Sequence, residues 1–209
     1  MAGSSGIMPI DNFSELEFIN LKNISKITNL SGVFYCASSF NQDISNWDVS
    51  NVTDFSDMFC HATSFNHSLD KWNTSLAVDM HGMFDYAISF NSSIASWNTK
   101  NVELMWDMFA NAVIFNKPIE NWNTSKVKEM FRMFQFAEAF NQPIEKWDVS
   151  NVRSMQSMFE HATSFNQPLN KWKTHKLEDA YAMFKEASAF NQPIDNWDLS
   201  KITHKGSMF

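Results

Sequence analysis

The stretch MFQFAEAFNQPIEKWDVSNV, residues 133–152, recurs along the chain in one register, and its repetition decides the fold. Its Phe-Asn pair and its tryptophan both return every 25 residues without an insertion. Such a fixed period is typical of a solenoid, in which each copy packs on its neighbours. The copies are marked by Asn41, Asn66, Asn91, Asn116, Asn141, Asn166 and Asn191, and by Trp47, Trp72, Trp97, Trp122, Trp147, Trp172 and Trp197.

Bulky apolar residues keep the same period. Eleven of the thirteen methionines fall into two columns, which begin at Met58 and Met80. Fifteen of the twenty phenylalanines fall into two more columns, which begin at Phe34 and Phe40. Because only a packed interior demands the same bulk at the same phase, these columns are predicted to be layers of the core.

One copy, residues 51–75, shows how each repeat is expected to fold. Val52, Phe55, Phe59 and Ala62 follow one another at helical spacing, which predicts a short helix. Residues 69–75 alternate between apolar and polar at their end, which predicts a short strand. We therefore expect an α/β solenoid with one short helix and one short strand per 25 residues. Its strands would pair in a parallel sheet on the inner face.

The domain organisation is expected to have three parts. Residues 1–9 are interpreted as a leader or tag, and residues 10–34 as a degenerate N-terminal capping repeat. Residues 35–209 then hold seven repeats, and the chain stops inside a copy at Ser207-Met208-Phe209. We interpret this as truncation of a longer array, with end-to-end association of chains as the alternative.

Charge and composition exclude several classes of function. A formal net charge of −7 argues against nucleic-acid binding, which depends on Lys and Arg meeting phosphate. No apolar run approaches the length of a membrane span, so membrane insertion is not expected. The N-terminus also lacks a secretory signal. Cys36 and Cys60 lie one copy apart, where two free thiols are favoured over a disulfide.

The search for catalytic or metal-binding residues gives no candidate. The six histidines are scattered, and no His-x-x-x-His pair, Cys-x-x-Cys pair or glycine-rich phosphate loop occurs. A row of Asp48, Asp148 and Asp198 suggests calcium, but Lys173 interrupts it and each copy offers too few ligands. We expect no enzyme activity, no cofactor and no metal.

The asparagine column needs an explanation of its own. An asparagine at the same bend of all seven copies is expected to be buried, with its amide bonded to backbone groups that the bend leaves unpaired. The alternative is a solvent-facing row that binds a polar ligand. The tryptophan and asparagine columns are both assigned structural roles.

The outward positions of the expected strands vary between copies, which makes the strand face the candidate binding surface. Its candidate residues are Asn73, Asn98, Asn123, Lys146, Asp148, Lys171, Lys173 and His175. This face lacks the exposed aromatic residues that anchor tight protein interfaces, so weak and multivalent contact with a protein or a glycan is favoured. The alternative is that these residues only keep the chain soluble.

The repeated string resembles the BspA-like leucine-rich repeat proteins, in the 25-residue form of mycoplasma surface lipoproteins. The resemblance spans about residues 30–209. It implies a leucine-rich-repeat-like solenoid, display on the surface of a bacterial cell or secretion, and a role in adhesion or protein binding. We therefore expect a non-enzymatic surface binding module. The alternative is a structural spacer that associates through its ends.

Overall fold

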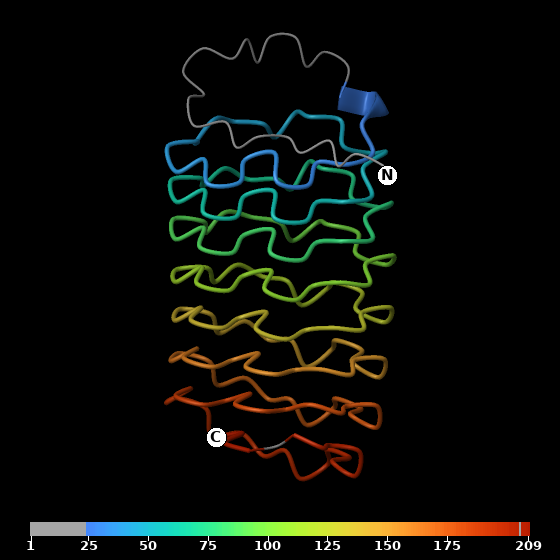
Figure 1. Ribbon diagram of the computed structural model, residues 1–209, viewed down its shortest axis with the longest axis vertical. Coiled ribbons are helices and arrows are strands. Elements are labelled where there is room, and N and C mark those ends of the chain that lie inside the picture. Colours follow the sequence, from blue (N-terminus) through green and yellow to red (C-terminus); the bar gives the residue numbers. More distant parts are fainter. Residues whose placement is uncertain (1–23, 205) are drawn as a thin grey trace, which may run out of the picture.

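The computed structural model describes residues 24–204 and 206–209 as a stack of 25-residue coils (Figure 1). Regular secondary structure within that part of the chain is limited to the 3-10 helix η2 (Ile24–Lys26) and to isolated parallel β-bridges. The bridges join equivalent residues of neighbouring coils, in the order Asn29, Asp54, Asp79, Leu104, Glu129, Ser154, Asp179 and His204. Each coil is therefore held beside the next along the whole described chain.

The described residues of the copies do not form the expected helices, and the prediction of an α/β solenoid is wrong. Residues 56–61 form a series of turns in which alternate N–H groups have different partners. Phe59 N–H donates to the carbonyl of Met83 in the next coil at 2.9 Å, whereas Ala62 N–H donates back to Phe59 at 2.9 Å. An α-helix would satisfy both groups within the segment. Here every second N–H group of the segment donates instead to a carbonyl of the neighbouring coil.

Left-handed residues explain why this segment cannot be helical. Asp57 has a φ of 52° and His61 a φ of 58°, and residues with positive φ recur at these two phases in the other coils. Each such residue costs roughly 1–2 kcal/mol in an L-amino acid and reverses the local hand of the backbone. The hydrogen bonds to the next coil offset this cost, because they satisfy N–H groups that would otherwise be buried without partners.

The expected strand and inner-face sheet are also absent. Residues 69–75 form turns, and Trp72 N–H donates to the carbonyl of Leu69 at 3.0 Å. The bridges lie instead in the column of Asp54, inside the segment where the sequence predicts the helix. The alternation nevertheless describes burial correctly, because Trp72 and Thr74 are buried while Asn73 is exposed. Period-two burial can arise from turns as well as from a strand.

The core consists of the predicted columns of apolar side chains. Phe59 and Phe84 stack with ring centroids 5.5 Å apart, and Trp72 and Trp97 with centroids 6.3 Å apart. Both phenylalanines are fully buried, and the methionines of the Met58 column lie beside them. Stacked rings at this separation remove their faces from water and gain dispersion energy between coils.

The ends of the chain are described in part. The expected leader at 1–9 and most of the expected capping repeat lie outside the described residues. Residues 24–34 continue the stack, since Phe34 N–H donates to the carbonyl of Met58 at 2.9 Å. Both cysteines are free thiols, Cys36 exposed and Cys60 buried. Within the described part, no helix has the length and apolar character needed to span a bilayer.

Candidate binding surface

The asparagine column forms a ladder of side-chain-to-backbone hydrogen bonds. Asn66 N–H donates to Asn41 Oδ1 at 3.0 Å, and Asn91 N–H donates to Asn66 Oδ1 at 2.9 Å. The same bond joins each later pair, as far as Asn191 on Asn166. The side chains are half-buried or exposed, so the expectation of full burial is wrong. Their oxygens nevertheless bond to backbone groups at the bend.

The tryptophan column forms a second ladder. Trp72 Nε1 donates to the carbonyl of Ile44 at 3.1 Å, and Trp97 Nε1 donates to the carbonyl of Leu69 at 2.9 Å. The four following tryptophans make the equivalent bond. Six described tryptophans are thus buried and bonded, while Trp47 is half-buried at the first coil. These side-chain bonds join neighbouring coils, as backbone hydrogen bonds between strands do in a sheet.

The exposed position after each tryptophan has a local structural role that sequence reasoning missed. Asn123 Oδ1 accepts from Ser125 N–H at 3.0 Å, and Asp148 Oδ1 accepts from Ser150 N–H at 3.0 Å. Asp48, Asn73, Asn98 and Asp198 make the same Asx turn. Asp and Asn suit this position best, since the side-chain oxygen must reach the N–H two residues on. Lys173 is the exception in the column.

Five of the eight predicted face residues line one shallow hollow of about 440 Å³. We call it the Lys173 hollow. It is lined by Glu145, Lys146, Trp147, Asp148, Val149, Ser150, Lys171, Lys173 and His175. Asn73, Asn98 and Asn123 stand in the same exposed column in earlier coils and do not line it. The structure therefore concentrates the candidate face into two neighbouring coils.

The charges of the Lys173 hollow are only partly balanced. Lys171 Nζ lies 2.8 Å from Glu145 Oε2. Hydrogen bonds from Ser150 lower the pKa of Asp148, with a further contribution from the nearby charges of Lys173 and His175. Lys146 and Lys173 are exposed and make no hydrogen bond or ion pair with the described residues. Two ammonium groups are therefore available to a ligand.

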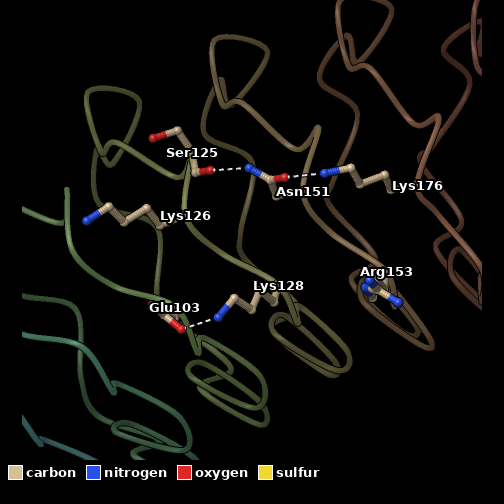
Figure 2. A pocket seen from close by; sticks show the side chains of 7 residues that line it. All are labelled: Glu103, Ser125, Lys126, Lys128, Asn151, Arg153 and Lys176. Atoms are coloured by element: carbon tan, nitrogen blue, oxygen red, sulfur yellow. Dashed lines mark hydrogen bonds and ion pairs between the residues drawn. The ribbon is translucent and has the colours of Figure 1, made fainter.

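A second hollow, of about 350 Å³, is formed mainly by residues at the first three positions of the copies (Figure 2). The sequence did not predict it. We call it the Arg153 hollow. It is lined by Glu103, Ser125, Lys126, Lys128, Asn151, Arg153 and Lys176. Glu103, Lys128 and Arg153 fall in segments that the sequence assigns to helices, and the other four residues lie just before such segments. The available signal was that basic residues recur at two phases of the repeat, 25 or 50 residues apart.

A third group of charged side chains surrounds His81. Its Nδ1 lies 2.7 Å from Asp79 Oδ1, and its Nε2 lies 3.6 Å from Asp57 Oδ2. Burial lowers the pKa of His81, but hydrogen bonds and charges from the two aspartates outweigh it and raise the pKa to about 9. The Trp106 ring stacks on the imidazole, with centroids 3.9 Å apart. A histidine with its pKa raised in this way carries a positive charge near neutral pH.

Further along this face, Arg132 Nη2 lies 2.6 Å from Asp107 Oδ2. Burial raises the pKa of Asp85 to about 6. No set of three or more His, Cys, Asp or Glu side chains in the described chain is arranged to hold a metal ion. The grouping thus balances charge between neighbouring coils.

Comparison with known proteins places the repeats in a family. No curated protein matches the chain. The family model described as "Mycoplasma protein of unknown function, DUF285" matches twice, over residues 9–120 and 105–209. The two matches overlap and together span most of the chain. With its columns of phenylalanine, asparagine and tryptophan in register, the chain belongs to this mycoplasma repeat family.

Proposed function

We propose that this protein is a non-enzymatic binding module, and that the Lys173 hollow contacts its ligand. The observation that carries the proposal is Lys173 itself. At the other described copies of this position, an Asp or Asn oxygen closes the turn of its coil. A lysine has no acceptor, so this coil forgoes that hydrogen bond.

The missing turn hydrogen bond makes this coil locally less stable, which indicates that Lys173 serves a function other than stability. Proteins break a local structural rule mainly where function requires it. The replacement at Lys173 adds an exposed cation beside Lys146 and Lys171, and His175 stands at the position where serine closes most of the other turns. The departure from the pattern and the hollow thus coincide in the same coil.

The form of the surface favours recognition over catalysis. The hollow is shallow and open, and its polar groups are spread over two coils. Such a surface suits weak contacts repeated along an extended ligand. The BspA-like resemblance of the repeat supports placement at the cell surface and a role in adhesion to protein or glycan. The alternative of an end-joining spacer has no observation of its own in its favour.

A charge-reversal pair tests the proposal on arrays of immobilised glycans and surface proteins. The test variant is Lys146→Glu with Lys173→Glu. The matched control is Lys71→Glu with Lys100→Glu, which changes the net charge equally at exposed positions in earlier coils. We expect the test variant to lose at least roughly tenfold in affinity for bound array components and the control to keep it. Equal loss in both variants, or binding unchanged in the test variant, would refute this site.

A further inference from the structure

We infer that the Lys173 and Arg153 hollows form one continuous site for a linear anionic polysaccharide that carries sulfate or carboxylate groups. This inference rests on the proposed function and names the ligand class. The first support is the distribution of charge along the chain. Residues 126–176 hold eight of the sixteen basic residues and five of the 23 acidic ones, a formal charge of +3. Residues 1–125 hold five basic and thirteen acidic residues, a formal charge of −8.

The two hollows meet at one edge of the stack. Ser150 and His175 line the Lys173 hollow, and the next residues in sequence, Asn151 and Lys176, line the Arg153 hollow. Consecutive Cα atoms are about 3.8 Å apart, so no other segment separates the two hollows at these points. A ligand that occupies one hollow therefore reaches the other by crossing a single turn of each coil.

Neutral partners hold two of the ammonium groups over the Arg153 hollow. Lys176 Nζ donates to Asn151 Oδ1 at 2.6 Å, and Asn151 Nδ2 donates to the carbonyl of Ser125 at 2.7 Å (Figure 2). Lys126 Nζ donates to Asn101 Oδ1 at 2.8 Å. An amide oxygen fixes the position of the ammonium group but leaves its charge uncompensated. Both charges thus remain available to an anion.

The other two cations of this hollow have exposed acidic partners. Lys128 pairs with Glu103, and Arg153 Nη1 lies 3.3 Å from Glu178 Oε1. Exposed ion pairs contribute little to stability, so a sulfate or carboxylate can share these cations at low cost. Arginine also suits planar or tetrahedral oxyanions, because its guanidinium offers two parallel donors.

The side chains that line the two hollows favour a polysaccharide over a protein or a nucleic acid. Among the residues that line the two hollows, the one Phe, Tyr or Trp is Trp147 in the Lys173 hollow, and it is buried. Aromatic anchors for a protein, or platforms for stacking bases, are therefore missing there.

Heparin is the probe for this inference, measured by calorimetry over a series of salt concentrations. The test variants are Lys128→Gln with Arg153→Gln in one hollow and Lys146→Gln with Lys173→Gln in the other. Lys71→Gln with Lys100→Gln is the matched control. We expect each test pair to weaken heparin binding by roughly tenfold and to reduce its salt dependence, while the control matches the parent chain. The melting temperature of each variant shows that it is folded.

Competitors separate this inference from the proposed function. Chemically desulfated, N-acetylated heparin keeps its carboxylates at a lower charge density and should therefore compete more weakly than heparin, and poly-glutamate or a DNA oligonucleotide of equal charge should also compete less well than heparin. Equal competition by all polyanions, or equal loss in the control, would overturn the inference. If heparin does not bind while the array ligand still depends on Lys146 and Lys173, the inference fails and the binding module stands. If neither heparin binding nor binding of the array ligand depends on these lysines, both the inference and the proposed function fail.

Discussion

Asn116 Oδ1 accepts the backbone N–H of Asn141 in the next coil at 3.0 Å, and its own N–H donates to Asn91 Oδ1 at 3.0 Å. Each asparagine from Asn66 to Asn166 therefore joins the coil before it to the coil after it. The side-chain oxygen replaces a backbone acceptor at a bend where neighbouring main chains do not form a ladder. This explains why a short side chain with an acceptor oxygen recurs at every copy.

Replacing Asn116 with alanine should lower the stability of the stack. The N–H of Asn141 would lose its acceptor, and Gln142 Nε2 would lose the closer of its two acceptors, Asn116 Oδ1 at 2.8 Å, and keep the Asn116 carbonyl at 3.1 Å. We expect a loss of about 1–3 kcal/mol, measured as a lower midpoint of urea unfolding. Lys117→Ala, one residue further on, is the control and should have a small effect. Unchanged unfolding of Asn116→Ala would mean that the ladder is dispensable.

Stability should fall as the pH rises from about 6.5 to about 9, through the titration of His81. Its pKa in the folded protein, about 9, lies above the ordinary value of 6.5, because Asp57 and Asp79 favour the protonated ring despite its burial. The protonated ring therefore contributes fully below pH 6.5, and the contribution is lost as the pH approaches 9. Melting temperatures between pH 6 and 9.5 measure this. In His81→Asn the decline should be much shallower, and an equal decline would assign it to other groups.

Asp85→Asn should stabilise the protein near neutral pH. Burial raises the pKa of Asp85 to about 6, so folding pays a penalty for its charge that is small below about pH 4 and complete above pH 6. An asparagine removes the charge and keeps an oxygen for Asn111 Nδ2, which lies 3.3 Å away. We expect a gain of about 1–2 kcal/mol at pH 7.5 and almost none at pH 4. A gain of the same size at both pH values would contradict this cause.

Lys173→Asn should raise stability and lower anion binding in the same variant. The asparagine restores the turn hydrogen bond that Asn123 makes with Ser125 at 3.0 Å, worth about 0.5–1.5 kcal/mol. It also removes one of the two cations of the Lys173 hollow that have no partner among the described residues. Thermal unfolding and heparin calorimetry measure the two effects. Asn123→Lys is the reciprocal control and should lose stability. If Lys173→Asn is no more stable, the turn argument is wrong.

Sequence patterns described burial far better than backbone conformation. The positions of Val52, Phe55, Phe59 and Ala62 in the core followed from their spacing, and all four are buried. The helix inferred from the same spacing does not exist. Overlapping turns with left-handed residues at Asp57 and His61 bury the same side chains as a helix would. Nothing in the local sequence separates these conformations, because the deciding hydrogen bonds are made to another coil.

The candidate site, like the fold, was only partly predictable from the sequence. The basic character of Lys171, Lys173 and Lys176 was visible in the sequence. The Arg153 hollow was not, because Lys128 and Arg153 lay in segments assigned to helices and its other residues lay at the borders between the expected elements. The role of Asn123 and Asp148 as turn acceptors was also missed. Without that role, Lys173 could not be recognised as the position where a structural residue had been replaced.

The sequence by itself determined the period, the side chains that form the core and the asparagine and tryptophan columns that join the coils. It could do so because bulk and hydrogen-bonding capacity repeated at a fixed phase require a fixed environment. The tertiary structure alone decided the path of the backbone and the meeting of the two basic hollows at one edge. The reason is physical: each coil finds many of its hydrogen-bond partners about 25 residues away, in a neighbour that no local pattern describes.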